Sequence, residues 1–166
     1  MTRRTLISST LLAISGVSLF SQAAEASVAT GTLSVSMTIQ ASCTLASTSP
    51  VAFGTQGVLT ANTDATGSLA VQCTNTTPYT VALDAGGGTG ATTALRKLTS
   101  GAVTVSYALY RDSSRTLTWG NTQGTDTVAG TGNGSNQTLT VYGRVPSQAS
   151  PTPGAYADTV NVTITY

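Results

Sequence analysis

Residues 29–39 read ATGTLSVSMTI, a stretch in which small or apolar residues alternate with Ser and Thr. The small and apolar positions are Ala29, Gly31, Leu33, Val35, Met37 and Ile39. In an extended chain, alternate side chains point to opposite faces, so this set would share one face and the hydroxyl-bearing set the other. The stretch therefore predicts a half-buried β-strand.

The same alternation recurs along the chain between turns rich in Gly, Asn and Pro. It predicts strands over residues 67–74, 79–83, 102–110, 116–119, 137–145 and 159–166. Residues 91–98 are the only candidate helix, and residues 120–136 are expected to form a long loop or a hairpin tip. No internal repeat or shift in composition marks a second domain. The number of strands predicts one all-β domain, an immunoglobulin-like β-sandwich.

The composition excludes several classes of protein. The 166 residues include 52 Ser and Thr, only 8% charged residues and no His. Without His there is no Ser-His-Asp triad, Cys-His dyad or His-ligated metal site. Without an excess of basic residues there is no electrostatic surface for nucleic acid. We therefore expect no catalytic residues, no cofactor, no metal ion, no nucleic acid and no small-molecule substrate.

Residues 1–26 predict a secretory signal peptide. Arg3 and Arg4 precede a mostly apolar run, residues 6–20, and Ala24-Glu25-Ala26 fits the small-x-small cleavage pattern. A transmembrane anchor is the alternative, but the apolar run is shorter than the ~20 residues that a spanning helix needs. Cleavage after Ala26 would leave residues 27–166 as a single domain without net charge.

Cys43 and Cys73 are the only cysteines of the chain. In an exported protein, one pair of cysteines predicts one disulfide. Two free thiols or a pair of metal ligands are the alternatives. The metal interpretation lacks the further Cys or His ligands that such a site requires.

The position of residues 29–39 near the start of the exported chain allows a second interpretation of this strand. A terminal strand ordinarily pairs within its own sheet. A free apolar strand and an exposed sheet edge are nevertheless complementary, because main-chain hydrogen bonds and side-chain pockets let one bind the other. The chain also ends at Tyr166, inside an alternating strand. The pattern alone leaves both interpretations open.

Several short motifs follow one another along the chain. They are Ala41-Ser42-Cys43, Val51-Ala52-Phe53-Gly54, Val71-Gln72-Cys73-Thr74, Pro78-Tyr79-Thr80-Val81-Ala82-Leu83, Val105-Ser106-Tyr107-Ala108-Leu109-Tyr110-Arg111-Asp112, Trp119-Gly120, Val141-Tyr142-Gly143-Arg144-Val145-Pro146 and Pro153-Gly154-Ala155-Tyr156-Ala157-Asp158-Thr159-Val160. In this order and spacing they resemble the spore coat protein U family, which contains the subunits of archaic chaperone–usher pili. The resemblance runs from Leu33 to the C-terminus.

This resemblance implies an immunoglobulin-like β-sandwich that is incomplete, missing its last strand, and is completed by a donor strand. A periplasmic chaperone would lend that strand first. At an outer-membrane usher, the N-terminal segment of the next subunit would replace it. The expected partners are therefore identical or related pilus subunits, the chaperone and the usher. The expected location is a fimbria on the cell surface, reached through the periplasm, with a role in adhesion and biofilm formation.

The alternation of residues 29–39 fits this scheme, and it leaves open where the donor segment ends and whether Met37 and Ile39 belong to it. The donor segment is expected at about residues 27–36. Its inserted side chains would be Ala29, Gly31, Leu33 and Val35. The acceptor groove or the core of the subunit would contain Met37, Ile39, Val160, Val162 and Ile164. Two other functions stay open: a secreted spore- or cell-coat protein of the same fold, and a ligand-binding adhesin module.

Overall fold

The computed structural model describes residues 24–166, so most of the expected signal peptide lies outside the described residues. The chain divides into two units, Met1–Met37 and Thr38–Tyr166. In the first unit, residues 24–37 form neither strand nor helix, and every one of them is exposed. The prediction that residues 29–39 form a half-buried strand is therefore wrong. Among residues 24–166 no strand pairs with their backbone, and the apolar side chains are exposed.

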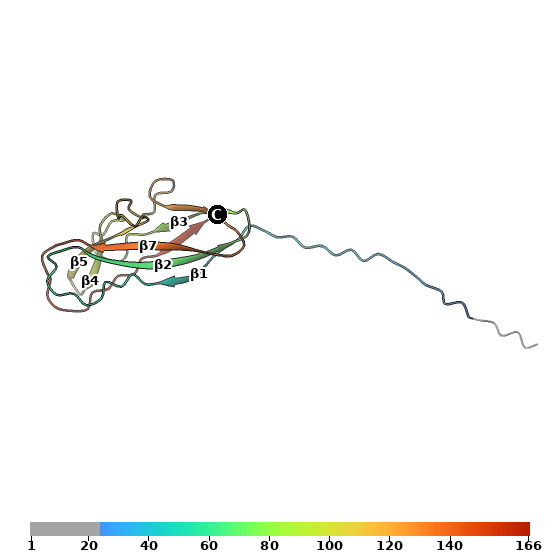
Figure 1. Ribbon diagram of the computed structural model, residues 1–166, viewed down its shortest axis with the longest axis horizontal. Helices are drawn as coiled ribbons and strands as arrows, with labels where there is room; N and C mark the ends of the chain where they lie inside the picture. The colour runs from blue at the N-terminus through green and yellow to red at the C-terminus, as the bar shows by residue number, and fades with distance from the viewer. Residues whose placement is uncertain (1–23) are drawn as a thin grey trace, which may run out of the picture. The chain divides into compact units, whose positions relative to one another are not determined.

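The second unit is an antiparallel β-sandwich. Its strands are β1 (Cys43–Ser49), β2 (Thr63–Cys73), β3 (Pro78–Leu83), β4 (Arg96–Ser100), β5 (Val103–Tyr110), β6 (Val128–Thr131), β7 (Asn136–Val145) and β8 (Val162–Thr165). One sheet has the order β1-β2-β7-β5-β4 and the other has the order β6-β3-β8 (Figure 1). The predicted all-β, immunoglobulin-like class is confirmed. Residues 24–166 contain no helix that is long and apolar enough to cross a membrane.

Three local predictions differ from the structure. The candidate helix at residues 91–98 is wrong, because Arg96–Ser100 pairs with β5 as a hairpin. A helix of eight residues gains too few hydrogen bonds to form without strong packing. Residues 116–119 form only a single bridge, between Tyr110 and Thr118. The expected loop at residues 120–136 contains the short strand β6.

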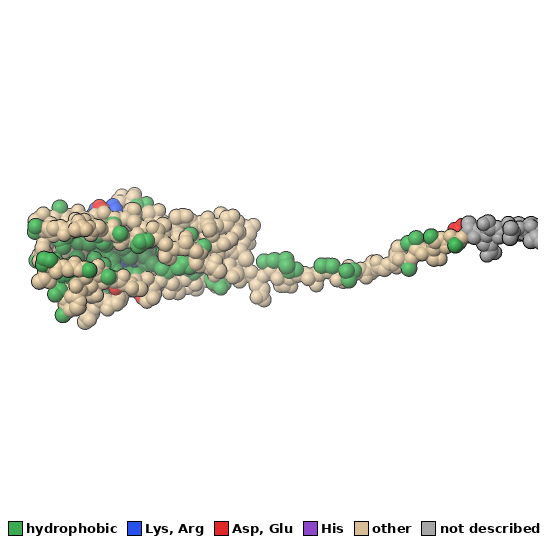
Figure 2. All heavy atoms as spheres, turned by 90° about the horizontal axis from the view of Figure 1, so that it is seen from below, with side chains coloured by type: hydrophobic (Ala, Val, Ile, Leu, Met, Phe, Trp, Pro, Cys, Tyr) green, Lys and Arg blue, Asp and Glu red, His purple; other side chains and the backbone are tan. Residues whose placement is uncertain are grey.

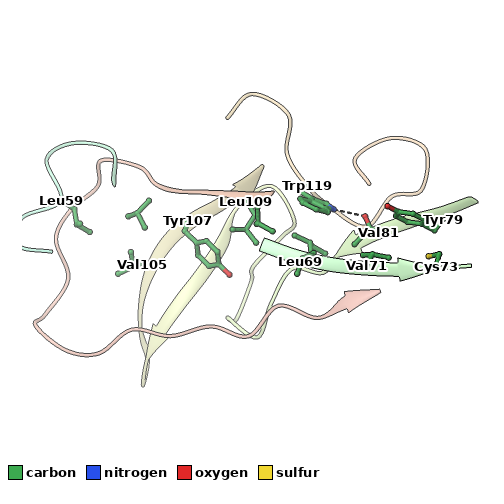
Figure 3. Packing of buried hydrophobic residues seen from close by; sticks show 13 residues of the cluster. Leu59, Leu69, Val71, Cys73, Tyr79, Val81, Val105, Tyr107, Leu109 and Trp119 are labelled. Atoms are coloured by element: carbon green, nitrogen blue, oxygen red, sulfur yellow. Dashed lines mark hydrogen bonds between the residues drawn. The ribbon is translucent and has the colours of Figure 1, made fainter. Parts of the chain in front are cut away.

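The core lies between the two sheets and is filled by alternate side chains of their inner faces (Figure 3). Trp119 is fully buried, and its indole Nε1 donates a hydrogen bond of 2.9 Å to the carbonyl oxygen of Val81. The predicted disulfide between Cys43 and Cys73 is confirmed. It joins the first residue of β1 to the last residue of β2, which are direct partners in the ladder. The edge strand β1 is thus fixed covalently to its neighbour.

Candidate functional site

Two strands with free edges meet on one side of the sandwich. Among the described residues, β1 pairs only with β2 and β8 pairs only with β3. β1 and β8 lie next to each other without a ladder between them. Both strands therefore present unpaired backbone N–H and C=O groups toward the space that separates them.

β1 and β8 run in opposite directions along this space, which we call the acceptor groove. The residues just before β1, Ile39–Ala41, line a cavity of about 380 Å³ together with the turn at residues 74–78. Tyr166, which follows β8, lines the same cavity. β1 thus begins at the end of the acceptor groove where β8 stops.

The floor of the acceptor groove is apolar. Leu45 of β1 is the ladder partner of the fully buried Val71 but is itself 39% exposed. Val160, Val162 and Ile164 pack against the core and are only partly buried. Figure 2 shows a face of the domain on which hydrophobic side chains form a strip bordered by polar atoms. This side of the core is incompletely covered.

Glycines in the large sheet let the segment that follows β1 lie over the core. A Cβ at Gly67 would lie 2.8 Å from Val51 Cγ2, and one at Gly143 would lie 2.9 Å from Phe53 Cζ. Val51 and Phe53 are both partly buried and pack against the core. The absence of side chains at these two positions lets the chain between β1 and β2 lie directly on the sheet.

Asp84 fixes the residue that precedes β8. Its carboxylate accepts hydrogen bonds from the N–H groups of Gly86 and Asn161, each 2.9 Å long, and from Asn161 Nδ2 at 2.6 Å. Burial raises the pKa of the Asp84 carboxyl. The hydrogen bonds from Asn161 and Gly86 outweigh burial and hold this pKa below its usual value. Asp84 therefore stays ionised at neutral pH and keeps accepting these bonds.

The structure places the expected donor residues in solvent. Ala29 and Gly31 are exposed, and Leu33 and Val35 are 89% and 86% exposed. The expectation that Met37 and Ile39 lie in the core is wrong, because they are 83% and 70% exposed. The unpaired apolar face therefore continues to Ile39, which lines the cavity at the end of the acceptor groove.

Sequence reasoning missed the β1 side of the acceptor groove. A register shift between Leu45 and Ser47 interrupts the alternation of β1, so the period of two is not visible there. Gly67 and Gly143 were a usable signal, since a glycine inside a strand often marks a close approach of another segment. Among residues 24–166, no group of three or more His, Cys, Asp or Glu side chains could hold a metal ion.

Comparison with known proteins identifies the family. The model of the Spore Coat Protein U domain matches residues 29–163. Protein U of Myxococcus xanthus is 35% identical over 158 residues, which cover 86% of this chain and 88% of that protein.

A solved structure with a similar fold is the CsuC–CsuE chaperone–tip adhesion subunit pre-assembly complex from the archaic chaperone–usher Csu pili of Acinetobacter baumannii. The TM-score is 0.54 at 22% identity, over 78% of this chain and 40% of that chain. The present chain thus spans less than half the length of that chain, and the likeness concerns the fold. This family is one of structural proteins, so the chain is not an enzyme. It belongs to the Spore Coat Protein U domain family.

Proposed function

We propose that the chain is a structural subunit of a surface fibre, joined to the next subunit by donor-strand exchange. One observation carries the proposal: within the described residues, the same chain holds two neighbouring edge strands with a free side and an alternating apolar segment that pairs with no strand. Residues 29–39 alternate and are exposed throughout, while β1 and β8 have free edges above a partly exposed core. Each would complete the other.

The geometry of insertion follows from the fold. All ladders of the sandwich are antiparallel, so we expect the donor strand to run antiparallel to β8 along its free edge. Leu33 and Val35 would then cover Val162 and Ile164, and Ala29 and Gly31 would occupy narrower positions. Backbone hydrogen bonds would supply affinity, and alternate side chains would set the register.

The direction of the donor strand favours a second molecule as its source. An antiparallel donor would finish at the end of the acceptor groove opposite Tyr166, whereas Ala41 of the same chain lies beside Tyr166. Residues 36–42 would have to return along the whole length of the seven-residue β1, about 23 Å at ~3.3 Å per residue. That span requires a fully extended linker. A donor from another subunit has no such constraint.

The remaining partners belong to the same proposal. Before assembly, a periplasmic chaperone would fill the acceptor groove, and an outer-membrane usher would exchange its strand for the donor of the next subunit. Support comes from the fold shared with the chaperone–tip adhesion subunit complex. Export through the predicted signal peptide, a place on the cell surface, and a role in adhesion and biofilm formation follow from this assignment.

A secreted spore- or cell-coat protein of the same fold is the second candidate. The identity with Protein U of Myxococcus xanthus and the description of the family favour it. Such a protein could use the same acceptor groove while assembling without an usher. The two candidates differ in whether polymerisation of the purified chain needs a chaperone-bound precursor.

The test uses the full mature chain, residues 27–166, directed to a bacterial periplasm with and without a co-expressed cognate chaperone. The proposal predicts detergent-resistant ladders from the chaperone-bound chain. Leu33→Asp together with Val35→Asp should abolish them, and a peptide of residues 27–40 should cap the resulting monomer. Ser34→Asp together with Ser36→Asp is the matched control, because these side chains lie on the opposite face. Ladders that survive the first pair of changes would contradict donor-strand exchange.

A further inference from the structure

The last strand of the domain is short and stands at a sheet edge, yet it must stay in place while one of its sides is unpaired. β8 has four residues and pairs with β3 through Leu83–Val162 and the three following pairs. A four-residue edge strand with a free side contributes few hydrogen bonds of its own. The residues just before β8 therefore decide whether its free edge is presented in one register.

Asn161 extends the β3–β8 ladder by one residue. In addition to the carboxylate contacts of Asp84, the N–H of Asp84 donates to the carbonyl oxygen of Asn161 at 3.1 Å. Three hydrogen bonds thus join the residue after β3 to the residue before β8. Two of them end on a charged carboxylate, which makes them stronger than bonds between neutral groups.

Asp158 holds the chain where it crosses from one sheet to the other. The preceding residue, Ala157, exchanges two backbone hydrogen bonds with Thr99 on β4 of the large sheet. The Asp158 carboxylate accepts a bond of 2.8 Å from the hydroxyl group of Tyr107, on β5 of the same sheet. It also accepts a bond of 2.8 Å from the N–H of Gly87, in the loop that follows β3. Asp158 therefore links the two sheets directly upstream of β8.

Two features of the surroundings favour these contacts of Asp158. Burial and the hydrogen bond to Asp158 raise the pKa of Tyr107, so its hydroxyl stays protonated and able to donate. Gly86 has a φ of +77°, and a Cβ there would collide with the Asp158 carboxylate. The loop after β3 is thus shaped to accept this side chain.

A buried cation supports the same loop. Arg96 is fully buried, and its guanidinium donates to the carbonyl oxygens of Leu83, Asp84, Thr93 and Trp119 at 2.8–3.1 Å. Burial lowers the pKa of Arg96, while the negative charges of Asp84 and Asp158 act in the opposite direction. A buried charge is costly unless it is compensated. Through its bonds to the carbonyl oxygens of Leu83 and Asp84, Arg96 therefore fixes the backbone at the end of β3.

We propose that Asp84 and Asp158, supported by Arg96, are positioning residues that keep β8 in register while the acceptor groove is empty, so that a donor strand meets a preformed edge. This inference rests on the proposed donor-strand function. Without these contacts, β8 could shift or fold over the apolar floor, and each binding event would first have to restore it. Preorganisation of this kind acts on the rate and affinity of binding.

The test uses the full mature chain with Leu33→Asp and Val35→Asp, which cannot donate its own strand but keeps the acceptor groove. In this background we compare Asp84→Ala and Asp158→Ala with Asp112→Ala. Asp112 is the matched control, because its carboxylate also accepts several hydrogen bonds, from Thr116 and Leu117, but none from the segment before β8. Association of a labelled peptide of residues 27–40, thermal unfolding and amide exchange of residues 162–165 are measured.

Asp84→Ala and Asp158→Ala should each slow association by about tenfold, the effect of losing hydrogen bonds to a charged group. They should also release the amides of β8. Asp112→Ala should lower the unfolding temperature without changing association. Asp158→Asn should restore association to within about threefold, since its amide can remake most of the bonds. Tyr107→Phe removes one bond while keeping the ring, so it provides a milder variant should the alanine variants not fold.

Two outcomes would overturn the inference. In the first, association falls equally in Asp158→Ala and Asp112→Ala, in proportion to stability. In the second, the amides of β8 stay protected from exchange in Asp84→Ala and Asp158→Ala. If the peptide binds no variant, the proposed donor-strand function is refuted. Amide exchange still tests whether Asp84 and Asp158 hold β8 in place, because it does not depend on the peptide.

Discussion

Leu45 on β1 lies directly opposite Val71 on β2, and the two differ sharply in burial: Val71 is fully buried, whereas Leu45 is 39% exposed. Direct partners in an antiparallel ladder point to the same face of the sheet. The difference therefore arises from what lies over each residue. Val71 is covered by the opposite sheet, and Leu45 faces the gap where β1 has no second neighbour.

Leu45→Ala should lower the stability of the peptide-bound subunit more than that of the empty subunit. Because Leu45 is half-exposed in the empty subunit, its truncation should change the free energy of unfolding there by less than about 1 kcal/mol. Binding of the donor peptide would bury the rest of the side chain, so the variant should bind more weakly. Peptide titration measures the affinity, and thermal unfolding with and without peptide measures the stability of the bound and the empty subunit. Thr44→Ala, on the outer face, should alter neither. Equal losses in the empty and the bound state of Leu45→Ala would contradict a missing strand at this place.

Replacing both cysteines by alanine should destabilise the domain, because the unfolded chain gains conformational entropy when the crosslink is lost. The disulfide spans a sequence separation of 30 residues. Closing a loop of this size corresponds to about 3–4 kcal/mol in the chain-entropy view. Urea unfolding of the double variant and of the oxidised and reduced parent measures the loss. The reduced parent should match the double variant. An unchanged urea midpoint would show that the β1–β2 ladder alone fixes the edge strand.

Gly143→Ala should disturb the wall beside the acceptor groove. The added methyl would lie 2.5 Å from Val51 Cγ1 and 2.9 Å from the ring of Phe53, so that segment must shift. We expect a loss of about 1–3 kcal/mol in the free energy of unfolding, typical of overpacking, together with weaker peptide binding. Gly57→Ala is the control, because nothing lies within 4 Å of its Cβ position. A neutral Gly143→Ala would mean that residues 51–53 are free to move off the sheet.

The stability of the domain should fall as the pH is lowered from neutral into the acid range. The hydrogen bond from Arg144 lowers the pKa of Asp64, and hydrogen bonds from Asn161 and Gly86 hold the pKa of Asp84 below its usual value. A carboxyl with a lowered folded-state pKa contributes its full stability above its unfolded value of 3.8 and loses it as pH falls through the folded value.

Because the chain has no His, the free energy of unfolding should stay nearly constant between about pH 5 and pH 7 and fall below about pH 4. Urea unfolding across this range measures the profile. Asp64→Asn combined with Asp84→Asn should flatten the acid limb. An acid limb of unchanged steepness in this double variant would assign the acid sensitivity to other groups.

The sequence predicts the fold class because the inner faces of β2, β5 and β7 keep a strict period of two. It fails where tertiary contacts override the local pattern. Residues 29–39 show the clearest alternation of the chain but have no partner, because a strand exists only beside another strand. Residues 91–98 look weakly helical, yet the hairpin with β5 makes Arg96–Ser100 a strand.

The candidate site was only partly predictable for the same reason. Val160, Val162 and Ile164 stand out by their alternation, and they pack against the core as partly buried side chains. Leu45 was hidden by the irregular register of β1. Asp84 contacts Asn161 and Asp158 contacts Gly87, each more than 70 positions away in the chain, so no local pattern could reveal these contacts.

The central claim is that the acceptor groove of one molecule takes residues 29–39 of another. The most direct measurement assembles equal amounts of ¹⁵N-labelled and unlabelled mature chain with photo-leucine at the leucine positions, followed by irradiation and mass spectrometry. The account predicts crosslinks from Leu33 to the peptide that contains Val162 and Ile164, with pairs that combine one labelled and one unlabelled chain. Crosslinks found only within chains of one label, or none between Leu33 and β8, would contradict it.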